Sequence, residues 1–167
     1  MNPIWNLRLQ LLLAFAIIFI AGCAQLPGAK GPIDIKNTNW QGRLALRVHS
    51  TPEQSFSSHF DLQGNPQAGT LLLTTPLGTT LAAIHWSPAN ATLQTGGTVQ
   101  QFDSLAVLAA HVTGTDIPIT SLFAWLQGVA SPAPGWQTDL SEIPTGKLSA
   151  HRIPPDTPAD LKIILDR

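Results

Sequence analysis

The stretch that decides the fold is residues 70–86, which read TLLLTTPLGTTLAAIHW. Two runs rich in leucine, threonine and alanine are joined by proline and glycine, a pattern that predicts a β-hairpin. In the turn, Pro76 sets φ at the second position and Gly78 suits the fourth, so Leu77 is left at the tip. Because burying a leucine is worth roughly 1.5–3 kcal/mol, an exposed Leu77 would be held for a lipid or a partner. The alternative is that Leu77 folds back onto its strands or is an ordinary scattered surface residue.

Composition narrows the class of protein. The chain has 167 residues, 44% of them hydrophobic, which is enough for one domain with a core. The formal net charge is -1 and only 11% of residues are charged, so no basic stripe exists and nucleic acid is not expected as a partner. Thirteen glycines and fourteen prolines indicate a β-rich fold with frequent turns. With one cysteine, no internal disulfide can form.

The first residues have the layout of a secretory signal. Arg8 precedes an apolar run over 9–20, which is too short for a comfortable membrane span of ~20 residues. The sequence 20–23, Ile-Ala-Gly-Cys, resembles the bacterial lipobox, in which the cysteine is lipidated and the preceding peptide is removed. We therefore expect residues 1–22 to be a lipoprotein signal peptide and Cys23 to carry the lipid anchor, with an incidental cysteine as the alternative. Several acyl chains together make such anchoring durable.

The residues after the cysteine predict the destination and a tether. In the bacterial sorting system that this signal resembles, Asp after the lipidated cysteine usually means retention at the inner membrane, and here Ala24 favours the outer membrane. Residues 23–39 are polar, broken by proline and glycine, and lack periodicity. A coil of this length spans roughly 20–25 Å. We expect the folded domain to occupy residues 40–167.

Alternating apolar and polar residues predict further strands, and spacing of three and four residues predicts two helices between them. Asp103 or Ser104 can cap the first helix and Gly114 can end it, while the second begins near Pro118 and stops at Gly128. The result is an antiparallel sheet interrupted once by a helical pair, which would close a pocket if the sheet curls. The remaining strands are expected at 44–48, 54–62, 92–95, 98–102, 136–140, 148–153 and 161–165.

With these pieces the chain resembles the outer-membrane lipoprotein LolB family. The resemblance rests on the lipobox, Gly42-Arg43 at the first strand, the hairpin 74–80, and the run 102–128 with its Asp-Ile-Pro-Ile joint at 116–119. It implies an incomplete antiparallel β-barrel with a helical lid. It also implies a monomeric receptor that faces the periplasm, accepts lipoproteins from the periplasmic carrier LolA and inserts them into the outer membrane. The family's membrane-inserting loop falls on Pro76, Leu77 and Gly78.

A carrier of acyl chains needs a roomy apolar pocket with few directed polar groups, because these chains offer no hydrogen bonds. Six large apolar residues are candidates for the pocket wall, although each of them could equally be sealed core. They are Phe60, Leu62, Leu72, Trp86, Leu122 and Trp125.

Motifs of catalysis are not found in the sequence. It contains no Gly-x-Ser-x-Gly elbow, His-Glu-x-x-His helix or Walker loop, and its five histidines are dispersed. We therefore expect no enzyme, no cofactor and no metal site. Two alternatives stay open: a lipid hydrolase built from distant Ser, His and Asp residues, and a structural outer-membrane lipoprotein that transfers no lipid.

Overall fold

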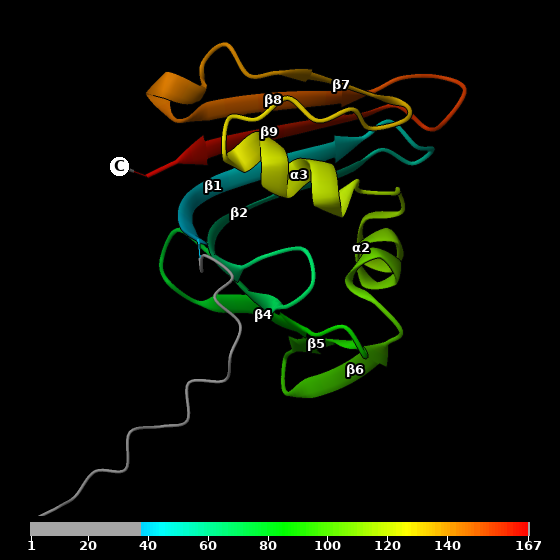
Figure 1. The fold of residues 1–167 in the computed structure, drawn as a ribbon. Helices are drawn as coiled ribbons and strands as arrows, with labels where there is room; N and C mark the ends of the chain where they lie inside the picture. The colour runs from blue at the N-terminus through cyan, green and yellow to red at the C-terminus, as the bar shows by residue number, and fades with distance from the viewer. Residues whose placement is uncertain (1–37, 167) are drawn as a thin grey trace, which may run out of the picture. The chain divides into compact units, whose positions relative to one another are not determined.

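Nine antiparallel strands form one sheet in the computed structural model, which describes residues 38–166 (Figure 1). They are β1 (Thr38–Val48), β2 (Gln54–Gly64), β3 (Gly69–Thr74), β4 (Thr80–Trp86), β5 (Ala91–Thr95), β6 (Thr98–Phe102), β7 (Trp136–Asp139), β8 (Lys147–Arg152) and β9 (Ala159–Leu165). Their order across the sheet is β6-β5-β4-β3-β2-β1-β9-β8-β7. Within the described residues β6 and β7 do not pair, so the barrel is incomplete. The predicted fold class is confirmed.

The predicted signal peptide, Cys23 and the tether up to residue 37 lie outside the described residues. The sequence predicts a tether that ends at residue 39, whereas β1 already begins at Thr38. Thr38 and Asn39 pair with Gly64 and Gln63 of β2. The hydroxyl of Thr38 also donates to the backbone oxygen of Gly64 at 3.3 Å. Because both residues are polar, the hydrophobic pattern could not reveal them.

Close approach between β1 and β9 depends on Gly42. A Cβ at this position would lie 2.0 Å from the carbonyl oxygen of Ile164, which no side chain could tolerate. Glycine within a strand often marks a tight bend of a barrel. β1 is strongly curved (Figure 1), and this curl turns one face of the sheet inward.

Two helices connect the free edges of the sheet. In α2 (Leu105–Thr113), the side chain of Ser104 accepts a hydrogen bond of 3.2 Å from the backbone N–H of Val107. Gly114 ends α2 with φ 67°, as the sequence predicts. Helix α3 (Ile119–Leu126) follows. Because β6 precedes α2 and β7 follows α3, the chain must cross from one edge to the other, and the helices cover the concave face (Figure 1).

Aromatic contacts fix α3 to the sheet. The ring of Phe123 lies edge-on to Trp40 of β1 at 5.7 Å and to Trp86 of β4 at 6.3 Å. Trp125 is 1% exposed, and its indole N–H donates to the backbone oxygen of Ser131 at 2.8 Å. Buried aromatic pairs of this geometry contribute about 0.5–1.5 kcal/mol beyond area burial. This end of the helical cover is therefore firmly attached.

A carboxylate between two histidines ties strands together on the outer face. Asp160 lies 2.8 Å from His49 Nε2 and 2.5 Å from His151 Nδ1. The hydrogen bond with His49, followed by that with His151, holds the pKa of Asp160 below its usual value. Because the folded-state pKa is the lower one, this stabilisation is present above the ordinary aspartate pKa and is lost as the pH falls through the folded value.

Candidate functional site: an apolar cavity beside an exposed hairpin tip

A cavity of about 300 Å³ lies between the curled sheet and the two helices. Strands β1 to β4 and β9 supply one wall, and α2, α3 and the joint between them supply the other. The lining consists of Leu44, Leu46, Val48, Gln54, Ser55, Phe56, Leu62, Leu71, Leu73, Ile84, Trp86, Leu105, Leu108, Ala109, Val112, Thr113, Ile117, Ile119, Leu122, Phe123, Leu161 and Ile163.

The lining is apolar and carries no charge. Its polar members are Gln54, Ser55 and Thr113, apart from the indole nitrogen of Trp86. The Thr113 hydroxyl donates to the backbone oxygen of Ala109 at 2.8 Å, and the Trp86 indole donates to that of Asn65 at 2.9 Å. These two donors are satisfied within the fold, and the other two polar residues, Gln54 and Ser55, are exposed. The interior of the cavity therefore offers contact area with few directed hydrogen bonds. This chemistry suits a hydrocarbon chain.

The volume sets how much hydrocarbon fits. At about 300 Å³ the cavity lies at the lower end of the range of small-molecule pockets, which is about 300–1,000 Å³. A single hydrocarbon chain therefore matches the closed cavity better than a ligand with several chains.

The mouth is marked by lining residues that are also exposed to solvent. Phe56 at the start of β2 is 41% exposed, and Val112 at the end of α2 is 51% exposed. Gln54 is exposed beside Phe56. The cavity therefore opens between the first residues of β2 and the last turn of α2.

The hairpin tip between β3 and β4 holds Leu77 in solvent, where it is 95% exposed. The N–H of Gly78 donates to the Thr75 backbone oxygen at 2.9 Å, and the N–H of Thr75 donates to the Thr79 backbone oxygen at 2.8 Å. Gly78 has φ +84°, which L side chains rarely adopt. Backbone bonds build the turn, and the alternative in which Leu77 folds back is therefore wrong.

The tip and the mouth lie at the same end of the sheet. β2 and β3 are antiparallel, and His59 of β2 pairs with Thr74, the last residue of β3. Residues 75–79 therefore extend from the sheet on the side from which β2 starts. Since Phe56 marks the mouth on that side, a chain leaving the cavity emerges near the end that carries Leu77.

Of the six predicted wall residues, the structure places Leu62, Trp86 and Leu122 in the cavity lining. The prediction is wrong for Phe60, Leu72 and Trp125, which do not line the cavity. Phe60 and Trp125 are buried and do not border the cavity. Leu72 alternates with the lining residues Leu71 and Leu73, so it points to the outer face and is 39% exposed.

The prediction missed the contribution of α2 to the wall. The spacing of Leu105, Leu108, Ala109 and Val112 places them on one face of α2, and all four line the cavity. The signal that could have found them was this stripe itself, because it runs along the whole of a helix laid across the sheet.

The family model for outer membrane lipoprotein LolB matches residues 36–152, which include β1 to β8 and both helices. The chain belongs to the LolB family. The match spans the exposed hairpin tip, the mouth and the whole cavity lining except Leu161 and Ile163 of β9.

Relatives of known family membership agree with this result. The outer-membrane lipoprotein LolB of Shewanella loihica is 36% identical over 71% of this chain and 56% of its own length. That of Bordetella petrii is 33% identical over 78% of this chain and 67% of its own length. That of Dechloromonas aromatica is 28% identical over 96% of this chain and 97% of its own length. The chain thus spans little more than half the length of the Shewanella relative.

Other kinds of site are not seen in the part of the chain that the structure describes. Residues 38–166 contain no group of three His, Cys, Asp or Glu side chains placed to hold a metal ion. Among the helices of this part, none has the length and apolarity needed to cross a bilayer.

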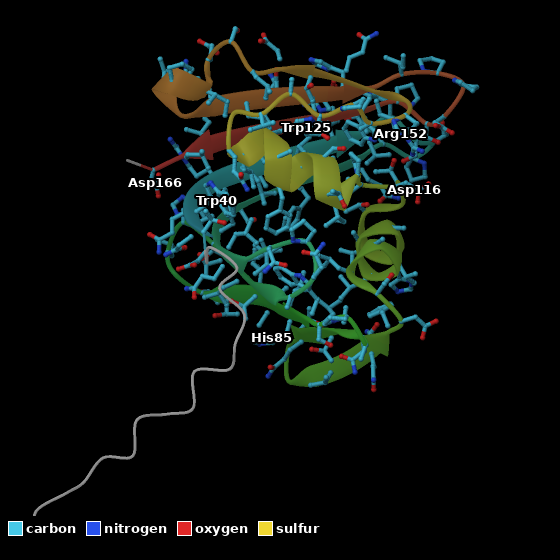
Figure 2. The ribbon with its side chains drawn as sticks, in the orientation of Figure 1. Trp40, His85, Asp116, Trp125, Arg152 and Asp166 are labelled. Carbon is cyan, nitrogen blue, oxygen red and sulfur yellow. The ribbon has the colours of Figure 1, made fainter. Side chains whose placement is uncertain are left out.

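Arg152 of β8 ties the joint between the helices to the sheet (Figure 2). Its guanidinium donates to the hydroxyl of Thr115, and its Nη2 lies 3.6 Å from Asp116 Oδ2 and 3.1 Å from Asp156 Oδ2. The indole of Trp136 in β7 donates to the backbone oxygen of Asp116 at 3.3 Å. The Arg152 side chain is only 11% exposed and Thr115 is buried, so water screens the hydrogen bond between them little. The carboxylates of Asp116 and Asp156 are 84% and 50% exposed, so water screens the two ion pairs and they contribute less.

Replacing Arg152 with methionine is expected to lower the free energy of unfolding by about 1–3 kcal/mol, because the buried Thr115 hydroxyl loses its partner. Backbone amides at 113–117 should exchange with deuterium faster, since the joint is released. Urea titration and hydrogen exchange measure the two effects. Lys162→Met, at an exposed position of β9, is the control and should change stability by no more than about 0.5 kcal/mol. Equal exchange rates in both variants would mean that Arg152 does not restrain the joint.

Proposed function

We propose that this LolB-family protein is an outer-membrane-anchored receptor for lipoproteins. It accepts them from a periplasmic carrier of the LolA type, holds acyl chains in its cavity and inserts them into the outer membrane. The anchor is the lipidated Cys23, and the folded domain faces the periplasm. The role requires neither catalysis nor a cofactor.

The observation that carries this proposal is the shared position of the uncharged cavity mouth and the exposed Leu77. The mouth accepts hydrocarbon, and the 95% exposed leucine reaches a bilayer before any other part of its hairpin. Transfer from the carrier needs no nucleotide, because a difference in affinity between donor and acceptor suffices to move the cargo. Release into the bilayer then continues downhill.

Uptake of a whole lipoprotein anchor requires the helical cover to open. The cavity has a volume of about 300 Å³, at the lower end of the range of small-molecule pockets, whereas a triacylated cysteine brings three acyl chains. We propose that α2 moves outward. Phe123 and Trp125 hold α3 to its surroundings by aromatic packing and a hydrogen bond, and Arg152 holds the joint to the sheet.

A reconstituted transfer assay tests the function. A complex of the periplasmic carrier with a fluorescent lipoprotein is mixed with vesicles that contain the full lipidated protein. Fluorescence is expected to move to the vesicles, and protein-free vesicles are the control. If the label stays with the carrier to the same extent in both, the receptor function is wrong and a structural lipoprotein becomes the better interpretation.

No observation favours the hydrolase alternative. The two histidines that share Asp160 lie on the outer face of the sheet, and within the described residues no serine hydrogen-bonds to either of them. Incubation with phospholipid vesicles should therefore release no free fatty acid.

A further inference from the structure

Four of the nine strands carry no Asp, Glu, Lys or Arg, and His85 of β4 is the one histidine among them. Between Asp61 and Asp103 the sequence contains no Asp, Glu, Lys or Arg. This stretch forms β3, β4, β5 and β6, which are neighbours in the sheet and include its free edge. Figure 1 shows β4 to β6 at one end of the folded part and β7 to β9 at the other. Such an uncharged surface needs an explanation, because exposed edge strands usually carry charges that prevent unwanted pairing.

A row of side chains crosses the outer face of these four strands. The pairing register aligns Leu72 with Ala83, Ala83 with Gln94, and Gln94 with Val99. Leu72 is 39% exposed and Val99 is 62% exposed. Both point away from the cavity, since the neighbours of Leu72 line it and Val99 pairs with the exposed Gln94. Apart from Gln94, this row from β3 to the free edge is apolar and uncharged.

We propose that the outer face of β3 to β6 is a membrane-contact surface that lies against the boundary between lipid headgroups and acyl chains. The proposal rests on the proposed function, because it extends the contact made by Leu77. Leucine and valine gain by burial at this boundary, whereas a charge placed there is costly. Threonine and glutamine side chains, and the free edge of β6, still find hydrogen-bond partners among headgroups and water.

A bilayer fits this surface better than a second copy of the chain. The face is continuous with a tip that holds one leucine in solvent, and the predicted lipid at Cys23 keeps the domain beside a membrane. Contact along this face would also fix the direction in which the cavity mouth points relative to the bilayer. The tip of the β5–β6 hairpin lies at the same end of the sheet as Leu77, because Ala83 near the start of β4 pairs with Gln94 near the end of β5.

Ile164 provides a matched control on the same sheet. It is 40% exposed on the outer face of β9, close to the value for Leu72. Its register partners are Arg43 on β1 and Lys147 on β8, so charged side chains flank it on both sides. Leu72 and Ile164 are comparable in exposure and residue type. They differ in that charged side chains flank only Ile164.

Site-specific fluorescence tests the proposal. The chain has one cysteine, which the anchor consumes, so a new cysteine can be labelled alone. The full lipidated protein, with Leu72→Cys, Leu77→Cys, Val99→Cys or Ile164→Cys carrying an environment-sensitive dye, is placed in vesicles whose acyl chains bear nitroxide quenchers. Dyes at 72 and 99 are expected to be quenched about half as strongly as the dye at 77, as befits an interfacial contact, and the dye at 164 should stay near background.

The outcomes separate this proposal from the function on which it rests. Quenching at 77 alone would overturn the membrane-contact surface and leave the receptor function intact. Dyes at 72 and 99 that are shielded from water but not quenched by lipid would also overturn it, in favour of a second copy or another protein on this face. Quenching at 72, 77 and 99 in a protein that takes no cargo from the carrier would support the surface and contradict the function.

Discussion

Replacing Leu77 with glutamate is expected to slow delivery of lipoproteins into the membrane at least tenfold, while folding and cargo uptake stay intact. Leu77 is 95% exposed, and the turn is built by backbone bonds around Pro76 and Gly78, so the variant removes no folded contact. In the bilayer the variant loses roughly 1.5–3 kcal/mol of leucine burial. A deficit of 1.4 kcal/mol already corresponds to a factor of ten.

Release is measured as the rate at which a fluorescent lipoprotein moves from the loaded protein into liposomes. Cargo uptake and the free energy of unfolding are measured in parallel, and the latter should change by less than about 0.5 kcal/mol. Val129→Glu places the same charge at another exposed apolar position, 55% exposed and outside the cavity lining, and should release cargo at the normal rate. Normal release by the Leu77 variant would remove the tip from the mechanism.

Sequence patterns could predict the elements because their signals are local. The turn residues Pro76 and Gly78 lie where backbone geometry requires them, and Ser104 and Gly114 end α2 as capping chemistry predicts. Strand alternation also gave the correct face for Leu62 and the exposure of Leu77 followed from the turn. These inferences need no knowledge of distant contacts.

The wall of the cavity could be predicted only in part. Which inward-facing residues border empty space depends on how closely the helices pack against each part of the sheet. Phe60 and Leu62 share one face of β2, and only Leu62 borders empty space. Trp125 lies on a helix that lines the cavity, and yet its indole is fully packed and hydrogen-bonded to Ser131. Periodicity tells which side of an element is inward, and it does not tell whether the inward space is filled.

Filling the cavity should abolish cargo uptake without unfolding the protein. Ala109 lies on the α2 face that lines the cavity, so an indole at this position projects into the space that an acyl chain would use. Ala109→Trp is expected to reduce uptake from the carrier at least tenfold, which corresponds to 1.4 kcal/mol or more of lost binding. The free energy of unfolding should change by less than the ~1–3 kcal/mol typical of overpacked cores, because the indole enters the space of the cavity and displaces no packed side chain.

Ala106→Trp is the matched control for this prediction. Ala106 is exposed, lies one turn earlier on the same helix and does not line the cavity. Both variants have the same composition and nearly the same helix propensity, so a difference in uptake reports the cavity alone. The measurement is cross-linking to an acyl-labelled lipoprotein, with urea titration of both variants. If Ala109→Trp folds and still takes cargo at the normal level, the acyl chains are held elsewhere, and the apolar cavity loses its role even though the tip at Leu77 could still meet the membrane.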